Sequence, residues 1–163
     1  MTRIINTNKF NKKIAYLQKL KSLNKESGLI FNSLDNILND FIGHKLFTIL
    51  KFDKINSNLE RVYTSKPREY PLQGKKDVIR NFWQVQVLEK GIAYIGYNSQ
   101  DIKNSFSDFD LIKKLGCSSV LIIPVKSGGN IKGSVNLLHE ESWYSGNDIK
   151  GAQKLVQLIS EVL

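Results

Sequence analysis

The residues of this chain with the clearest capacity for covalent chemistry are its only cysteine, Cys117, and one of its two histidines, His139. A thiol becomes a nucleophile when a nearby cation or histidine stabilises the thiolate. The spacing does not show whether these two side chains meet. Cys117 also follows Gly116 at the entrance to an apolar run, where a lone cysteine is typically a small buried hydrophobic residue. We therefore expect no catalytic residue, and a thiol-dependent enzyme using Cys117 with His139 is the alternative.

A second set of candidates is polar and lies in or beside apolar runs. Side chains alternate between the two faces of a strand, so Ser134 and Asn136 would share one face of the run Ile131–Leu138. Valine or isoleucine would suit a purely structural strand better at these two positions. We expect Ser134 and Asn136, with Ser119 on the preceding run, to contribute polar groups to a concave, mainly apolar ligand site. The alternative is an asparagine bonded to a neighbouring loop.

Metal and phosphate chemistry have little support. Glu140 and Glu141 follow His139, but the other histidine, His44, is distant in the sequence, and metal ligands are normally clustered. No glycine-rich loop follows a predicted strand and opens a helix, as nucleotide-phosphate binding would require. We expect no metal and no cofactor.

The net charge of +9 on 163 residues suggests a nucleic-acid partner until it is mapped. Residues 1–28 carry seven basic residues and one acidic residue, so most of the excess belongs to one N-terminal segment. A solvated helix face explains it, and an anionic partner is the alternative. One cysteine cannot form an internal disulfide, the apolar runs are too short to cross a bilayer, and Met1–Phe10 lacks the apolar core of a secretory signal. We expect a cytoplasmic protein without membrane or nucleic-acid partners.

The elements that must position the candidate residues include a hairpin. Two apolar runs, Val120–Val125 and Ile131–Leu138, flank Gly128, Gly129 and Asn130, which is typical of a β-hairpin. Amphipathic helices are predicted at both ends of the chain. The predicted helices are Phe10–Asn24, Ile30–Phe41 (ended by Gly43), Val78–Lys90, Ser107–Leu115 and a last helix capped by Ser145 or Asn147. The other predicted strands are His44–Asp53, Leu59–Ser65 and Ile92–Tyr97, with a loop at Lys66–Lys75. This order predicts an α+β fold with helices packed on an antiparallel sheet.

Three segments of the chain together resemble a GAF domain, the small-molecule-binding module of signalling proteins. They are Phe106–Val125 (FSDFDLIKKLGCSSVLIIPV), Gly128–His139 (GGNIKGSVNLLH) and Trp143–Tyr144 before the last helix. Arg61–Lys76 (RVYTSKPREYPLQGKK) is similar to a segment of small free-standing bacterial GAF proteins. The resemblance implies five to six antiparallel strands, with N- and C-terminal helices on one face and a pocket on the other.

The resemblance also directs attention to the segments that would close such a pocket. Tyr70, Phe82 and Trp83 lie there, and an aromatic ring can stack on a planar ligand or simply fill a small core, which is the more typical role for Phe82. The basic residues of these segments could meet a carboxylate or phosphate, or could be solvated. They are Arg61, Arg68, Lys75 and Lys76.

The single cysteine also bears on whether the resemblance implies an enzyme. Some GAF-fold enzymes reduce free methionine sulfoxide, but they use several cysteines at other spacings, and this chain has one. This difference argues against a reductase.

We interpret residues 1–163 as a single GAF-like domain, with a basic N-terminal helix in 1–26 and a C-terminal helix in 146–163. The expected function is a stand-alone small-molecule sensor that forms a homodimer through its terminal helices. The expected ligand-binding residues are Ser134, Asn136, Trp83, Tyr70, Ser119 and Arg61.

Overall fold

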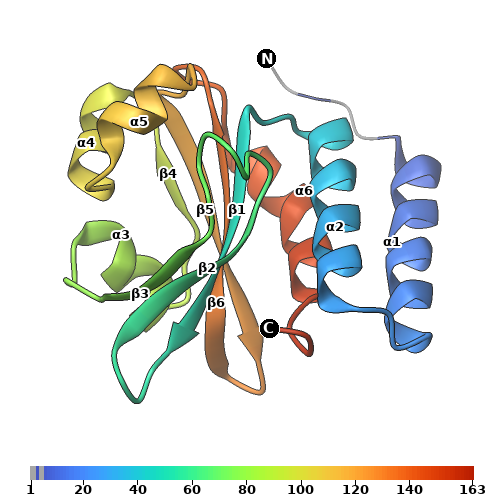
Figure 1. Cartoon of the computed structure of the whole chain (residues 1–163). Coiled ribbons are helices and arrows are strands. Elements are labelled where there is room, and N and C mark those ends of the chain that lie inside the picture. Colours follow the sequence, from blue (N-terminus) through green and yellow to red (C-terminus); the bar gives the residue numbers. More distant parts are fainter. Residues whose placement is uncertain (1–2, 4–5) are drawn as a thin grey trace.

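A computed structural model of the chain contains a sheet of six strands in the order β3-β2-β1-β6-β5-β4, with every neighbouring pair antiparallel (Figure 1). The structure describes residue 3 and residues 6–163, so the expectation for Met1–Phe10 lies partly outside the described residues. The strands are β1 (Leu46–Asp53), β2 (Asn58–Thr64), β3 (Gln73–Asp77), β4 (Tyr94–Gly96), β5 (Ser119–Ser127) and β6 (Asn130–His139). The predicted α+β class is confirmed.

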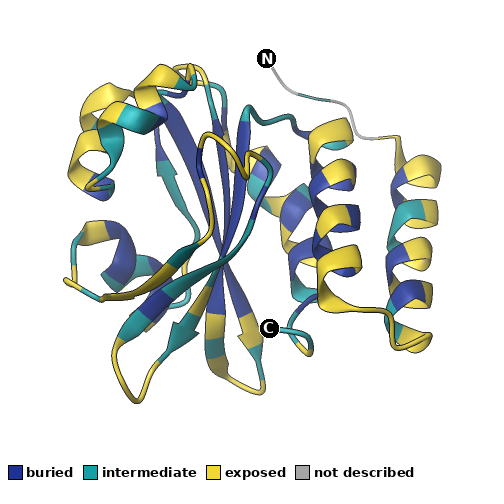
Figure 2. Ribbon diagram, viewed as in Figure 1, coloured by how far each residue is buried: buried dark blue, intermediate teal, exposed yellow. Residues whose placement is uncertain are grey.

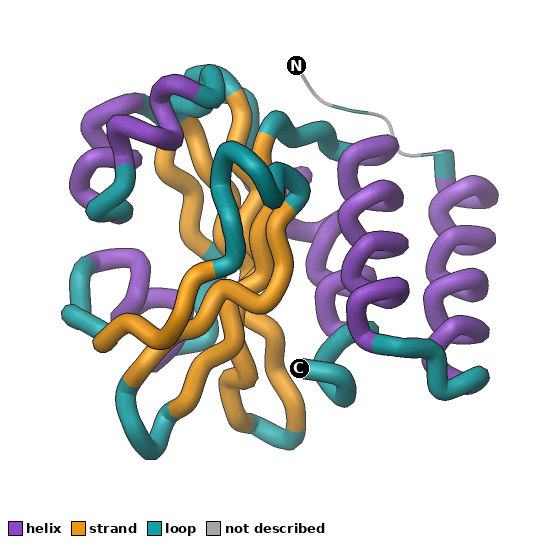
Figure 3. The backbone as a smooth tube through the Cα atoms, viewed as in Figure 1, coloured by secondary structure: helices purple, strands orange, loops and turns teal. Residues whose placement is uncertain are grey.

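The helices lie on both faces of this sheet. They are α1 (Thr7–Ser22), α2 (Ser27–Phe41), α3 (Phe82–Gln84), the π-helix η1 (Val85–Glu89), α4 (Ser99–Ser105), α5 (Phe109–Lys114) and α6 (Gly146–Gln157). Helices α2 and α6 lie on one face, with α1 against α2 on the side away from the sheet, while the short helices lie on the other face (Figures 1 and 3). In the part of the chain that the structure describes, none of the helices is long and apolar enough to cross a membrane.

The face of the sheet that α2 and α6 cover holds the larger core. Leu34 and Leu38 of α2 and Leu155 of α6 are fully buried with Phe47 and Leu137 of the sheet. The central strands are buried on both faces, whereas the outer surface of α1 is exposed (Figure 2). The lysines on that outer surface, Lys9, Lys12 and Lys19, are exposed as a solvated helix face requires.

The β5–β6 hairpin forms as predicted. Gly128 and Gly129 have φ angles of 56° and 80°, the left-handed values that a two-residue hairpin turn needs and glycine adopts without strain. Along β6, Asn136 lies between Thr48 of β1 and Ile122 of β5. The hairpin therefore carries Asn136 to the centre of the sheet.

A β-bulge in β2 decides which face each side chain of that strand occupies. Ile49 pairs with Tyr63 and Leu50 pairs with Arg61, so Val62 is an extra residue in β2. In a regular strand Arg61 and Tyr63 would share a face. Because of the bulge, Tyr63 points to the face covered by α2 and α6, where it packs on Phe47. Arg61 points to the opposite face.

The segment between β2 and β4 differs most from the prediction. Strand β3 occupies part of the predicted loop Lys66–Lys75, and the predicted helix Val78–Lys90 is wrong at its start. Arg80 adopts a left-handed φ of 53°, which no helix interior allows, and helical structure begins only at Phe82. The Gln84 side chain accepts a hydrogen bond from the Ile79 backbone N–H at 3.0 Å, which holds this turn. Helix α4 was also not predicted.

Candidate ligand-binding pocket

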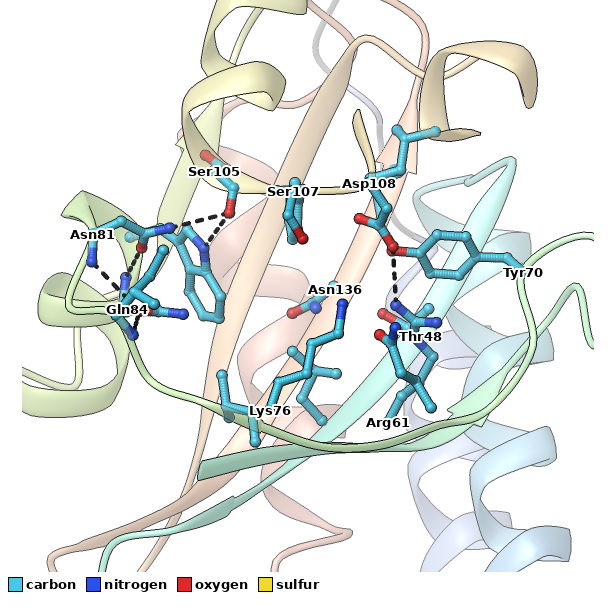
Figure 4. Close-up of a pocket in the computed structure, with 18 of the residues that line it drawn as sticks. Thr48, Arg61, Tyr70, Lys76, Asn81, Gln84, Ser105, Ser107, Asp108 and Asn136 are labelled. Carbon is cyan, nitrogen blue, oxygen red and sulfur yellow. Dashed lines mark hydrogen bonds and ion pairs between the residues drawn. The ribbon is translucent and has the colours of Figure 1, made fainter. Parts of the chain in front are cut away.

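A cavity of about 220 Å³ lies between the sheet and the segments that cover its second face (Figure 4). Its floor consists of side chains from the three strands β2, β1 and β6. Its walls are formed by the Lys66–Leu72 loop, by β3 with α3, and by the chain from Ser105 to Ile112. The floor residues are Leu59, Arg61, Thr48, Leu50, Asn136 and Leu138.

Two uncharged polar side chains lie among the apolar residues of the floor. Thr48 and Asn136 are directly opposite each other on β1 and β6, and both are almost completely buried. The Oδ1 atom of Asn136 accepts a hydrogen bond of 2.9 Å from the Ser134 hydroxyl. Among the described residues, no acceptor takes the Asn136 amide hydrogens. The side chain therefore has donor capacity to offer to a molecule in the cavity.

Arg61 is the cation of the floor, and it is held on three sides. Its guanidinium lies 3.8 Å from the centroid of the Tyr70 ring, and Nη1 donates to the Pro71 carbonyl oxygen at 2.8 Å. Nη2 contacts the Asp108 carboxylate at 3.4 Å, which is long for a charge-assisted hydrogen bond. The Nε atom is buried and has no hydrogen-bond partner among the described residues.

Tyr70 forms the wall beneath Arg61. Burial raises the pKa of its phenol well above the usual value, and the positive charge of Arg61 opposes that effect only in part. Tyr70 is therefore a neutral hydrogen-bonding group and an apolar surface at any physiological pH. Its stacking on the guanidinium helps to hold Arg61 in place.

Trp83 connects two of the covering segments. Its indole Nε1–H donates to the Ser105 carbonyl oxygen at 2.9 Å, and the Asn81 side chain donates to the same oxygen at 3.1 Å. The indole ring also lies beside Phe106. The neighbouring Phe82 is 73% exposed and lies edge-on to Tyr94 of β4, so the expectation that it fills the core is wrong.

The structure brings four of the six expected ligand-binding residues to this one cavity: Arg61, Tyr70, Trp83 and Asn136. Ser134 does not line the cavity but supports Asn136 from below. Ser119 lies elsewhere: it has the strand parity of Leu121, which faces the terminal helices, and its hydroxyl donates to the Glu140 carbonyl oxygen at 2.6 Å. Both serine hydroxyls donate hydrogen bonds within the protein, and neither side chain lines the cavity.

The basic residues near the cavity are divided by strand geometry. Lys76 pairs with Leu59 on the cavity side, and its side chain extends over the cavity toward Asn136 in Figure 4. Lys75 lines a separate surface hollow with Lys51. Arg68 is exposed and does not line the cavity.

Sequence reasoning missed Thr48, Ser107 and Asp108 as cavity residues. Thr48 had a detectable signal, since it is a polar side chain in a strand whose two faces are largely apolar. Asp108 was interpreted as a carboxylate of the first helical turn, but it makes no capping hydrogen bond and contacts Arg61 instead. That contact joins segments distant in the sequence, so no local pattern indicates it.

Cys117 and His139 are engaged separately. Cys117 is buried among the apolar residues under the covering helices, and burial raises the pKa of its thiol to about 11. The His139 ring stacks on the Trp143 ring, with 3.6 Å between their centroids. Its Nδ1 accepts a hydrogen bond of 2.8 Å from the Glu140 backbone N–H. Burial lowers the pKa of this histidine. Neither environment activates a thiolate.

We expect Cys117 to react slowly with a thiol reagent in the native protein. At pH 8 a pKa of about 11 rather than 9 lowers the thiolate fraction about 100-fold, and burial adds a steric barrier. The rate should rise as the pH approaches 11. Mass spectrometry after iodoacetamide treatment checks this, with protein in urea as the reactive control. Equal rates in the two states would restore the thiol hypothesis.

The described part of the chain does not contain a cluster of side chains suited to bind a metal ion. Among the described residues, no three His, Cys, Asp or Glu side chains gather closely enough to hold an ion. The cavity instead combines an apolar lining with a few polar and charged groups, a composition typical of sites for small organic molecules.

This sheet, with terminal helices on one face and a walled cavity on the other, has the GAF-domain fold. No protein-family profile and no curated protein matches the chain. Solved structures do match. The phycocyanobilin-bound GAF domain of a cyanobacterial phytochrome has 13% identity and a TM-score of 0.72, covering 94% of this chain and 92% of the other.

Two further structures extend the range of similar proteins. The GAF domain of an Acinetobacter phosphoenolpyruvate-protein phosphotransferase has 12% identity and a TM-score of 0.71, covering 98% of this chain and 93% of its own. Free methionine-R-sulfoxide reductase from Neisseria meningitidis, in complex with its substrate, has 11% identity and a TM-score of 0.67, covering 99% and 92%. At such identities the likeness establishes the fold, and the fold alone does not determine a ligand.

Proposed function

We propose that residues 1–163 act as one stand-alone, cytoplasmic sensory domain that binds a small metabolite in the cavity above Asn136. The observation that carries the proposal is the paired Thr48 and Asn136 at the centre of an apolar floor. Buried polar groups are costly unless they are hydrogen-bonded, so an asparagine amide directed at a cavity indicates a bound partner. Similar structures include a domain bound to phycocyanobilin and an enzyme bound to its substrate, which is consistent with this interpretation.

A metabolite screen by thermal shift tests the proposal. We expect at least one compound, at about 100 times its Kd, to raise the Tm by roughly 5–10 °C, because binding to the native state alone adds about 2.7 kcal/mol of stability. Asn136→Leu is the matched variant, since it keeps an apolar side chain of similar size and removes the amide. Compounds that stabilise Asn136→Leu equally bind elsewhere.

A second readout uses the two tryptophans of the chain. Trp143 lies near the terminal helices, so Trp143→Phe leaves Trp83 as the single tryptophan and as a reporter of the cavity. A true ligand should change the fluorescence of this variant. If a broad screen changes neither the Tm nor the fluorescence, the sensory proposal fails.

We also propose that the signal passes through a homodimer formed by the terminal helices. Exposed apolar side chains on α1, at its C-terminal end and on α2 support this arrangement, namely Tyr16, Leu23 and Leu29. Such side chains become buried when helices of two copies pack together. Sedimentation equilibrium of the purified protein measures the mass directly, and a monomer at all concentrations would exclude a dimer.

A further inference from the structure

Some N–H donors around the cavity have no hydrogen-bond acceptor among the described residues. Two N–H donors face the cavity, the Asn136 amide and the Lys76 ammonium, which extends over the cavity in Figure 4; Arg61 also lines it, and its Nε is enclosed by protein. Among the described residues, Nε has no partner, the Asn136 amide has no acceptor, and Lys76 makes no ion pair. A molecule that presents oxygen acceptors would satisfy the Asn136 amide and the Lys76 ammonium.

Arg61 is the decisive group because it cannot turn to solvent. Its side chain is only 9% exposed, and a buried charged donor without a partner is unfavourable. Its one carboxylate contact, with Asp108, is single and long at 3.4 Å. A guanidinium binds a carboxylate best through two parallel N–H bonds, and the single long contact with Asp108 leaves Arg61 without such a pair.

The formal charges around the cavity limit how much negative charge a ligand can bring. Arg61 and Lys76 are balanced by Asp77 and Asp108, which line the same cavity. A monoanion that displaces Asp108 from Arg61 leaves the partly exposed side chain of that aspartate to be solvated by water. A phosphate dianion would bring a second negative charge near two carboxylates, which is unfavourable in a partly buried site.

From these observations we infer that the cavity binds a small organic monocarboxylate, whose carboxylate displaces Asp108 from Arg61 and pairs with Lys76. This inference rests on the proposed ligand-binding function and adds the chemical class. The apolar body of the ligand lies against Leu50, Trp83 and Leu138. Because Asp108 directly precedes α5, the exchange also links ligand binding to the segment that covers the cavity.

The test compares carboxylates with their neutral amides as probes: benzoate with benzamide, phenylacetate with phenylacetamide, and hexanoate with hexanamide. Binding is measured by Trp83 fluorescence in the Trp143→Phe background and by thermal shift. In at least one pair we expect the acid to bind 10-fold or more tightly than its amide. Equal affinity within every pair, or no binding by any acid, overturns the inference.

Three variants then locate the anion. Lys76→Gln should weaken acid binding about 5- to 10-fold and amide binding less, because only the acid loses a charge pair. Lys75→Gln is the matched control, because it removes the same charge from the adjacent residue, which lies outside the cavity. Asp108→Asn removes the competing carboxylate and should tighten acid binding several-fold. Equal effects of the two lysine variants, or weaker acid binding in Asp108→Asn, contradict the proposed exchange.

Failure of this inference can be told apart from failure of the proposed function. If the broad screen finds a neutral or cationic ligand that depends on Asn136, the sensory function stands and the monocarboxylate class is wrong. If no compound of any class binds, both proposals fail.

Discussion

Gly133→Ala should disturb the pairing of β6 with β1 and lower the free energy of unfolding by more than about 3 kcal/mol. Gly133 of β6 lies between Lys51 of β1 and Val125 of β5. A methyl group there would overlap the Leu50 carbonyl oxygen and lie 2.8 Å from the Leu163 side chain. Because β1 is paired on both sides, its backbone cannot move away. A domain of this size has only about 5–15 kcal/mol in total, so poor expression or a large drop in the urea midpoint is expected.

Gly28→Ala is the matched control for this substitution. Gly28 lies in the first turn of α2, a Cβ there would meet nothing within 4 Å, and its φ is not left-handed. Alanine favours helix over glycine, so we expect a neutral effect or a gain of up to about 1 kcal/mol. Urea unfolding followed by circular dichroism compares the variants. A Gly133→Ala midpoint equal to that of Gly28→Ala would contradict the described packing of β1 on β6.

Trp83→Ala should lower the free energy of unfolding by about 3–5 kcal/mol and abolish ligand binding. Trp83 is almost fully buried, and its indole N–H holds the Ser105 carbonyl oxygen. Its removal leaves a void between α3 and α4 and deletes one wall of the cavity. Circular dichroism is the suitable probe of unfolding, because fluorescence would lose its main reporter.

Trp83→Phe separates the two roles of this side chain. Phenylalanine keeps much of the apolar surface but loses the hydrogen bond to Ser105, whose carbonyl oxygen still accepts from Asn81. We expect a smaller loss of about 1–2 kcal/mol and measurable, weakened binding. Full stability of Trp83→Ala would mean that the tryptophan does not hold the covering segments together.

Much of the fold could be predicted because its signals are local. Phe10, Leu17 and Leu20 recur at helical spacing and form the buried face of α1. Gly43 ends α2 with a φ of 91°, and the two glycines of the β5–β6 turn take the left-handed angles that the turn needs. Each of these features depends on residues a few positions apart, which is the range over which sequence patterns are informative.

The middle of the chain was predicted less well, since tertiary contacts override local preference there. Val78–Lys90 has helical spacing, yet Ile79 and Arg80 form a turn held by the Gln84 side chain. The residues that follow form one short α-helical turn and a π-helix, in which the Lys90 N–H bonds to the Val85 carbonyl. π-Helices are often found at functional sites, and this one directly follows the cavity wall.

The sequence by itself determined that the chain has apolar strands between amphipathic terminal helices, and that Asn136 interrupts one strand with an amide. Only the tertiary structure decided that Arg61 lies on the cavity face. That outcome depends on the bulge at Val62, which follows from the pairing of β2 with β1 and not from β2 alone. It likewise decided that Asp108 meets Arg61 and that Ser119 faces the other side of the sheet. Strand alternation can be read locally, whereas register and the contact between distant segments are set by the packing of the whole domain.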